Sequence, residues 1–289
     1  MSVTPSSLPD ASAGRPSSTT RRSGPRPFDW RRTPGLGPYT ALMVAFLYAP
    51  LLILVVYAFN SSQMITVWQG FSLRWFVKIA HNDDIRNAAL NSLVIAVVAT
   101  IASTVIAVTG ALALERGTRF VGRGFVTMLI AMPLVVPEII VAIATLVFFS
   151  SIGMHNGLVN LMIAHTVFCI PFALLPVQAR LREMGHALEE AGRDLYADEW
   201  QLFRRITLPL LAPAIASGAI MAFVVSLDDF LISMMVSSAG STTLPVYVYG
   251  MMRLGVTPEV NAISTILLAV SLVFVGVALL LGRRNRRAG

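Results

Sequence analysis

Residues 190–209 read EAGRDLYADEWQLFRRITLP, a charged and amphipathic segment between long apolar runs that carry almost no charge. If this segment and the residues just before it are helical, Leu188, Ala191 and Leu195 lie along one stripe, and charged residues occupy the opposite side. A segment of this kind between membrane spans is suited to contact a partner in water. We expect the stripe to be its docking face.

The composition places the rest of the chain in a membrane. Of its 289 residues, 55% are hydrophobic and only 13% are charged, which argues against a water-soluble globule of this size. The net charge of +7 does not indicate a nucleic-acid partner, because the basic residues lie in short connections rather than on a folded soluble face. The single cysteine, Cys169, lies in an apolar run, so neither a disulfide framework nor a paired metal ligand is expected.

Crossing about 30 Å of hydrocarbon takes roughly 20 helical residues, and six stretches are long and apolar enough to do so. They are approximately Tyr39 to Phe59, Ala88 to Leu114, Phe125 to Ser151, Gly157 to Ala179, Leu208 to Val236 and Asn261 to Leu281. The alternating pattern of a membrane β-barrel is absent, and helices pair every backbone polar group within their own segment. The sequence therefore predicts an all-α integral membrane protein with six transmembrane helices.

Lysine and arginine residues orient this bundle. Of the 22 basic residues, 18 fall in the N-terminal tail, the connection after the second span, the charged insert and the C-terminus. The other four lie in the two alternate connections. By the positive-inside rule, both termini and the insert are predicted to be cytoplasmic.

The same reading divides the chain into segments. Residues 1–38, rich in Ser, Pro and Arg, are predicted to be a disordered cytoplasmic tail. The further predicted segments are a first transmembrane helix at 39–59, a periplasmic segment at 60–87, a five-helix core at 88–282 with the cytoplasmic insert at 184–207, and a basic cytoplasmic tail at 283–289.

Three acidic side chains fall inside predicted spans. Asp228 and Asp229 lie in the fifth run and Glu138 follows a proline in the third. An ionised Asp near the bilayer centre costs roughly 2.5 to 3.5 kcal/mol, so a role beyond packing is expected. Adjacent helical residues point about 100° apart, so one aspartate can face a central pathway while the other meets a partner helix. The alternative is a structural pair satisfied by Ser226, Ser233 or a helix terminus.

The sequence contains no motif for binding ATP phosphates or for binding zinc. Lys78 is the only lysine and is not in a glycine-rich phosphate loop, so ATP is not expected to be hydrolysed by this chain. The four histidines form no zinc motif, and neither a metal nor a cofactor is expected. His165 lies within a span, where a hydrogen-bonded packing role is favoured over proton relay. The chain is therefore not predicted to be an enzyme.

The insert also resembles E-A-A-x3-G-x9-I-x-L-P, the cytoplasmic motif of ABC importer permeases. The matching positions are Glu190, Ala191, Ile206, Leu208 and Pro209. Two positions depart from the motif, since Gly192 replaces the second alanine and Tyr196 replaces the glycine.

A wider resemblance extends from about Tyr48 to Leu281. There the chain is similar to the inner-membrane permease subunits of spermidine/putrescine ABC importers, of the second-permease type. The stretches that carry the similarity are LYAPLLILVVYAFNSS at 47–62, SLDDFLIS at 226–233, TTLP at 242–245 and RLGVTPEVNAIST at 253–265. The SLDD and GVTPEVNA stretches point to the polyamine branch, although related permeases for other cations and for opine-like solutes share much of them.

The resemblance implies the type I importer permease fold in a bacterial inner membrane, and a set of partners. These are a periplasmic solute-binding protein, a second permease in a heterodimer, and two cytoplasmic ATPase subunits. It further implies that the insert is the helix that couples to the ATPase, through Glu189, Glu190, Ala191, Gly192, Leu195 and Tyr196. Because tyrosine is strained in a left-handed turn, we expect either a right-handed turn at Tyr196 or flexibility supplied by Gly192.

The predicted function is thus ATP-driven uptake of putrescine or spermidine, with Asp228, Asp229 and Glu138 on the solute pathway. Two alternatives stay open. The first is an ABC permease for another solute, such as an opine or ferric iron. The second is a proton-coupled secondary transporter, which would use the same acids and His165 but would not need the insert.

Overall fold

The computed structural model describes residues 36–64, 67–117, 121–255 and 257–286. The predicted tail at 1–38 lies outside these residues up to position 35, as does the end of the basic tail at 283–289. The chain divides into two units, residues 1–49 and 50–289, which are considered separately. Helix α1 (Leu36–Ala58) begins in the first unit and ends in the second.

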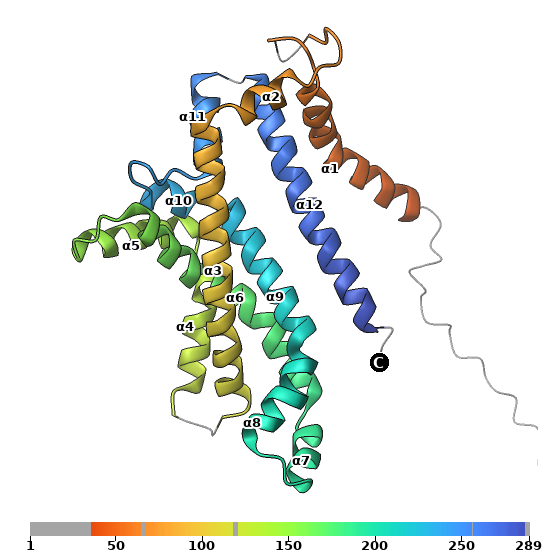
Figure 1. The fold of residues 1–289 in the computed structure, drawn as a ribbon, viewed down its shortest axis with the longest axis vertical. Helices are drawn as coiled ribbons and strands as arrows, with labels where there is room; N and C mark the ends of the chain where they lie inside the picture. Colours follow the sequence, from red (N-terminus) through yellow and green to blue (C-terminus); the bar gives the residue numbers. More distant parts are fainter. Residues whose placement is uncertain (1–35, 65–66, 118–120, 256, 287–289) are drawn as a thin grey trace, which may run out of the picture. The chain divides into compact units, whose positions relative to one another are not determined.

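The described residues form helices, joined by short connections, with one isolated bridge between Asn60 and Phe71 as the sole β pairing among them (Figure 1). After α1, the elements are α2 (Arg74–Ala80), α3 (Asp83–Glu115), α4 (Arg123–Val135), α5 (Glu138–Ser151), α6 (Gly157–Met184), α7 (Ala187–Asp194), α8 (Glu199–Leu202), the π-helical turn η2 (Phe203–Thr207), α9 (Leu208–Asp228), α10 (Leu231–Val236), α11 (Leu244–Leu254) and α12 (Pro258–Arg286).

Four helices in the described part of the chain are long and apolar enough to cross a membrane. They are α1 from Gly37, α3, α6, and one continuous helix, Glu199–Asp228, that includes α8, η2 and α9. Helices α4 and α5 meet this test only as a pair, and α12 contributes a shorter apolar stretch, Pro258–Val273. The all-helical class is confirmed. The described residues give four or five such spans, so they do not confirm the predicted number of six.

Helices α3, α6 and α9 pack closely against one another. One face of α3 buries a row of small side chains at helical spacing, Ala96, Ala99, Ser103, Ala107 and Ala111. Small residues allow helix backbones to approach closely, which drives packing where lipid offers no hydrophobic advantage. α6 and α9 approach each other closely at Gly218, where a Cβ atom would lie 2.6 Å from the carbonyl oxygen of Ala173.

The third predicted run is not one helix. α4 and α5 meet at an angle of 110°, with the break at Val136 and Pro137. Proline has no N–H to donate and disfavours helical geometry in the residue before it, and Val136 accordingly adopts an extended ψ of 134°. The hydropathy of this run therefore predicted apolar helix correctly but did not reveal the change of direction, which brings Glu138 to the first position of α5.

The fifth predicted run, Leu208 to Val236, is also interrupted. α9 ends at Asp228, Asp229 is extended with φ −61° and ψ 125°, and α10 begins at Leu231. The expectation that both aspartates lie on a continuous helix is therefore wrong. Their side chains diverge because the backbone leaves the helix between them.

Candidate functional site

The start of α5 and the break between α9 and α10 bring the predicted pathway acids together. Glu138 begins α5, Asp228 ends α9, and Asp229 lies in the break before α10, which packs against α5. The Glu138 carboxyl is close enough to both aspartates for their charges to interact. The structure therefore joins into one acid cluster three residues that the sequence placed in two separate spans.

The two aspartates differ in environment. Asp229 is buried, with 5% of its surface exposed, whereas Asp228 is exposed on the isolated chain. Oδ1 of Asp229 accepts a hydrogen bond of 2.8 Å from the backbone N–H of Ser233 in α10. Its Oδ2 is also buried, and the Asp229 carboxyl interacts with that of Glu138. Asp229 thus stabilises the start of α10 with one oxygen and keeps an acceptor beside a second carboxyl with the other.

His165 completes the polar interior around Asp229. Its Nδ1 lies 2.9 Å from Oγ of Ser226, and its Nε2 lies 3.1 Å from Oγ of Ser233 and 3.4 Å from Oδ1 of Asp229. Both ring nitrogens therefore have partners, and the histidine links α6 to α9 and α10. This geometry agrees with the hydrogen-bonded role favoured for His165 from the sequence. Ser226 and Ser233 are also the residues named above as possible partners of the two aspartates in a purely structural role.

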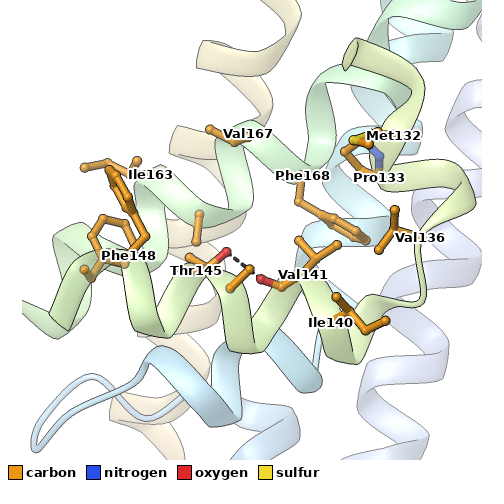
Figure 2. Close-up of a pocket in the computed structure, with 13 residues that line it drawn as sticks. Met132, Pro133, Val136, Ile140, Val141, Thr145, Phe148, Ile163, Val167 and Phe168 are labelled. Carbon is orange, nitrogen blue, oxygen red and sulfur yellow. Dashed lines mark hydrogen bonds between the residues drawn. The ribbon is translucent and has the colours of Figure 1, made fainter. Parts of the chain in front are cut away.

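An open pocket of about 470 Å³ lies beside the break between α4 and α5 (Figure 2). Its walls come from α4, α5 and α6 and are almost wholly apolar, with Phe148 and Phe168 among the largest side chains. The hydroxyl of Thr145 is turned to its own helix, where it donates to the carbonyl of Val141 at 2.7 Å. This pocket suits apolar groups and offers no carboxylate to a cation, so it is distinct in chemistry from the acid cluster.

The insert forms a compact unit at the start of α9, whereas the acid cluster lies at the end of that helix (Figure 1). Helix α7 packs on α8 and η2 at Gly192, where a Cβ atom would lie 2.4 Å from a methyl carbon of Leu202 and 2.9 Å from one of Ile206. A Cβ at this departure from the motif would therefore have to displace the ends of these two side chains. Gly192 is buried and cannot itself contact a partner.

The predicted docking stripe is exposed in this chain. Leu188, Ala191 and Leu195 are all exposed, and Trp200 adds a further exposed aromatic side chain. Glu190 is also exposed. These apolar side chains are thus accessible to a partner, and their docking role stays a prediction.

The Tyr196 backbone is left-handed, with φ 61°, and its side chain is 98% exposed. Both expectations for this turn were therefore wrong. The N–H of Ala197 donates to the carbonyl of Gly192 and that of Tyr196 to the carbonyl of Arg193. This pair of hydrogen bonds defines the Schellman motif that ends α7, with tyrosine in the position that glycine usually occupies.

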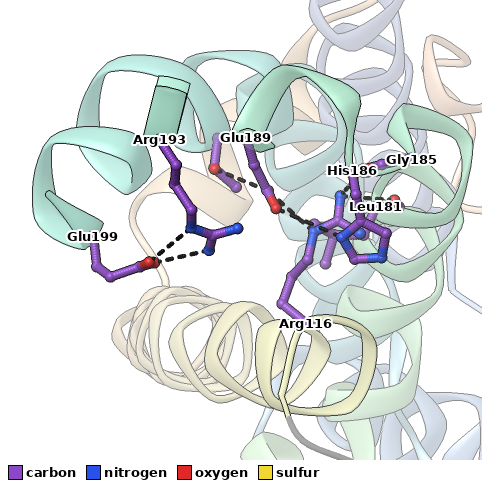
Figure 3. Close-up of polar contacts among 8 residues, drawn as sticks. Arg116, Leu181, Gly185, His186, Glu189, Arg193 and Glu199 are labelled. Carbon is purple, nitrogen blue, oxygen red and sulfur yellow. Dashed lines mark hydrogen bonds and ion pairs between the residues drawn. The ribbon is translucent and has the colours of Figure 1, made fainter. Parts of the chain in front are cut away.

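Glu189 differs from the other predicted coupling residues because it faces inward. It is 7% exposed, and its Oε1 lies 3.0 Å from Nε of Arg116 at the end of α3 (Figure 3). Arg193 and Glu199 form an ion pair of similar length, 2.9 Å, within the exposed part of the insert. The Glu199 carboxylate raises the pKa of the Arg193 guanidinium above its ordinary value through that hydrogen bond.

Sequence reasoning missed Arg116 and treated it only as one of the basic residues that orient the bundle. Its neighbour Glu115, at the last position of α3, was missed as well. The available signal was an Arg and a Glu side by side at the end of a span, but the partner in the insert lies 73 positions away.

Comparison with known proteins defines the class. The fold matches a crystal structure of a bacterial ABC transporter that imports the acidic polysaccharide alginate, with a TM-score of 0.66 and 15% identity over 84% of this chain and 93% of that one. Residues 106–287 match the family described as binding-protein-dependent transport system inner membrane component. The chain belongs to this family, and it is a membrane permease component of a transport system rather than an enzyme.

Two relatives from Escherichia coli strain K12 are similar over most of their length. The spermidine/putrescine transport system permease protein PotC is 39% identical over 86% of this chain and 93% of its own. The putrescine transport system permease protein PotI is 40% identical over 77% of this chain and 82% of its own.

Proposed function

We propose that this permease carries putrescine or spermidine across the inner membrane in an ATP-driven importer. The observation that carries the proposal is the similarity to two polyamine permeases over 86% and 77% of the chain. The acid cluster supports it, because polyamines are cations at neutral pH and carboxylates inside a membrane attract them. An anionic solute would be repelled by the same three groups.

Within this proposal the acid cluster is part of the solute pathway. Asp228, exposed at the end of α9, is the carboxylate that a passing ammonium group reaches. Glu138 and the buried Oδ2 of Asp229 supply further acceptors close by. Alternate contacts with several carboxylates provide weak multiple sites for a cation, so that it can both enter and leave.

The proposal assigns the partners as follows. The chain pairs with a second, different permease subunit, receives solute from a periplasmic binding protein, and docks onto a cytoplasmic ATPase through the exposed stripe of the insert. Both termini are then cytoplasmic, as the distribution of basic residues predicts. The exposed apolar surface around Leu195 and Trp200 is the main support for ATPase docking.

Uptake of radiolabelled putrescine and spermidine by the whole complex in proteoliposomes tests the solute. We expect uptake by the wild type, and at least tenfold slower uptake when Asp228→Asn removes the exposed charge. Asp229→Asn, which keeps an acceptor for the N–H of Ser233, should assemble and also slow uptake. Absence of polyamine uptake by an intact wild-type complex would reject the solute assignment, and opines and ferric complexes would then be screened.

Substitution at Tyr196 separates its backbone strain from its role in docking. A left-handed conformation costs a non-glycine residue about 1 to 2 kcal/mol, so Tyr196→Gly should stabilise the turn. We nevertheless expect Tyr196→Gly to lower stimulation of ATP hydrolysis several-fold, because it removes an exposed aromatic ring from the docking surface. Tyr196→Asn, which tolerates the same backbone conformation, is the matched control for loss of the ring. Unchanged transport and ATPase stimulation in both variants would show that the ring does not dock.

A further inference from the structure

Arg116 joins three helices through one side chain. It is the C-cap residue of α3, and its side chain is 14% exposed. Nε donates to Oε1 of Glu189 in α7 at 3.0 Å. Nη2 donates to the carbonyl of Leu181 at 3.2 Å and to that of Gly185, just beyond the end of α6. The planar guanidinium presents several donors in a fixed arrangement, so these contacts specify a position that a flexible ammonium group would not.

Glu189 extends the same connection to the base of α9. Its Oε1 also accepts a hydrogen bond of 3.2 Å from the hydroxyl of Thr207, the last residue of η2. Its Oε2 lies 3.9 Å from Nδ1 of His186, directly before α7. A single buried carboxylate therefore contacts groups from the end of α3, the start of α7 and the base of α9 (Figure 3).

The adjacent Glu115 makes a second connection between α3 and α6. Its Oε1 accepts hydrogen bonds from Nε2 of Gln178 at 2.7 Å and from Nε of Arg182 at 3.0 Å. Its Oε2 lies 3.3 Å from Nη2 of Arg123 in α4. The last residue of α3 and its C-cap residue therefore make different connections. Glu115 links α3 to α6 and α4, and Arg116 links both α3 and α6 to the insert.

The position of this ion pair has a mechanical consequence. The covalent chain connects the insert to α6 at one end and to α9 at the other, but it provides no direct link to α3. Within the described residues, the polar contact between α7 and α3 is the Arg116–Glu189 pair. The Arg193–Glu199 pair, by contrast, holds the insert to itself.

We propose that Arg116 is a positioning residue for coupling, which makes α3 and α6 follow a displacement of α7. The proposal rests on the proposed function of the insert as the ATPase docking element. It adds a route by which that displacement reaches the whole α3–α6–α9 bundle rather than α9 alone. Glu189 accordingly acts inside the permease, while the exposed Glu190 remains on the docking face.

The test measures solute moved per ATP hydrolysed, with the complete transporter in proteoliposomes. For Arg116→Ala, we expect at least half of the binding-protein-stimulated ATP hydrolysis to remain while uptake falls at least tenfold. Arg116→Lys restores the charge but not the contacts with two carbonyls, so its uptake per ATP should be intermediate. Arg86→Ala is the matched control, because Arg86 forms an exposed ion pair with Asp83 on the same helix; its ratio should equal that of wild type.

A structural role alone predicts a different pattern. Uptake and hydrolysis would then fall together, with an unchanged ratio, and the proposal would be rejected; a wild-type ratio for Arg116→Ala would reject it as well. If Arg116→Ala does not assemble, the ratio of uptake to ATP hydrolysis is measured for Glu189→Gln instead. Glutamine keeps an acceptor for Thr207 and Arg116 but loses the charge. A different result would reject the proposed function itself. In that case, ATP hydrolysis by the wild-type complex would not respond to its binding protein.

Discussion

Gly218→Val is expected to abolish assembly of the permease into its complex. A Cβ at this position lies 2.6 Å from the Ala173 carbonyl oxygen and 3.2 Å from two further backbone atoms of the same residue. The obstacle is the backbone of α6, which cannot move aside as the end of a flexible side chain can. Overpacking of a well-packed site costs typically about 1 to 3 kcal/mol, and displacement of two helices places this variant at the upper end or beyond.

Helix propensity favours the opposite result. Glycine is less favourable than other residues in a helix interior by at most about 1 kcal/mol, so removing it stabilises an unconstrained helix. Gly250→Val measures that effect without the clash, because a Cβ at Gly250 in α11 has no atom within 4 Å. The measurement is the yield and melting temperature of the purified complex. Equal behaviour of the two valine variants would show that α6 and α9 are not held at this distance.

Asp228→Lys is expected to reduce polyamine uptake at least 100-fold in a complex that still assembles. The exposed position of Asp228 leaves room for a longer side chain. The change replaces attraction of a cation by repulsion, and one pair of unit charges about 4 Å apart near a protein surface is worth about 4 kcal/mol. Asp228→Asn removes attraction only, so its loss should be smaller than that of the lysine variant.

The matched control for Asp228→Lys is Asp84→Lys. It makes the same change of net charge at an exposed carboxylate in the first turn of α3. Its uptake is expected to stay within about twofold of wild type, because Asp84 is not part of the acid cluster and the interactions of exposed charges are screened by salt. The ordering wild type, Asn, Lys in initial uptake rate is the signature of a carboxylate on the pathway. Equal rates for all three would place Asp228 outside it.

Much of the fold was predictable because hydropathy over about 20 residues reflects the cost of placing polar groups in hydrocarbon. α1, α3 and α6 each cover a predicted apolar run. The breaks were not predictable in the same way, since the run around Pro137 is apolar apart from Glu138, and an average of hydropathy over a window does not report a change of helix direction. Proline indicated a disturbance there, but the sequence gives neither the 110° angle nor the neighbours of the two helices, since α4 packs on α6 and α5 on α10.

The candidate site was likewise predictable only in part. Asp228, Asp229 and Glu138 were predicted from the cost of intramembrane charge, which is a local property of each residue. Their meeting in one cluster depends on the break after Asp228 and on the packing of α5 against α10. Arg116 and Glu189 are a long-range pair, so no local pattern identifies it. The left-handed Tyr196 opposes the local preference of the residue, and the hydrogen bonds that end α7 override it.

The helical continuity between the insert and the fifth span has a consequence for force transmission. Residues 199–228 form one continuous helical segment, which includes the π-helical turn η2 and at 1.5 Å per residue is about 45 Å long. A tilt of about 10° around its midpoint moves each end by about 4 Å. Asp228 is the last residue of this segment, and residues 199–207 at its start belong to the insert. Within the proposed coupling, a push on the insert would reach the acid cluster through continuous helix, as a lateral displacement on the scale of a single ammonium group, with no loop in between to absorb it.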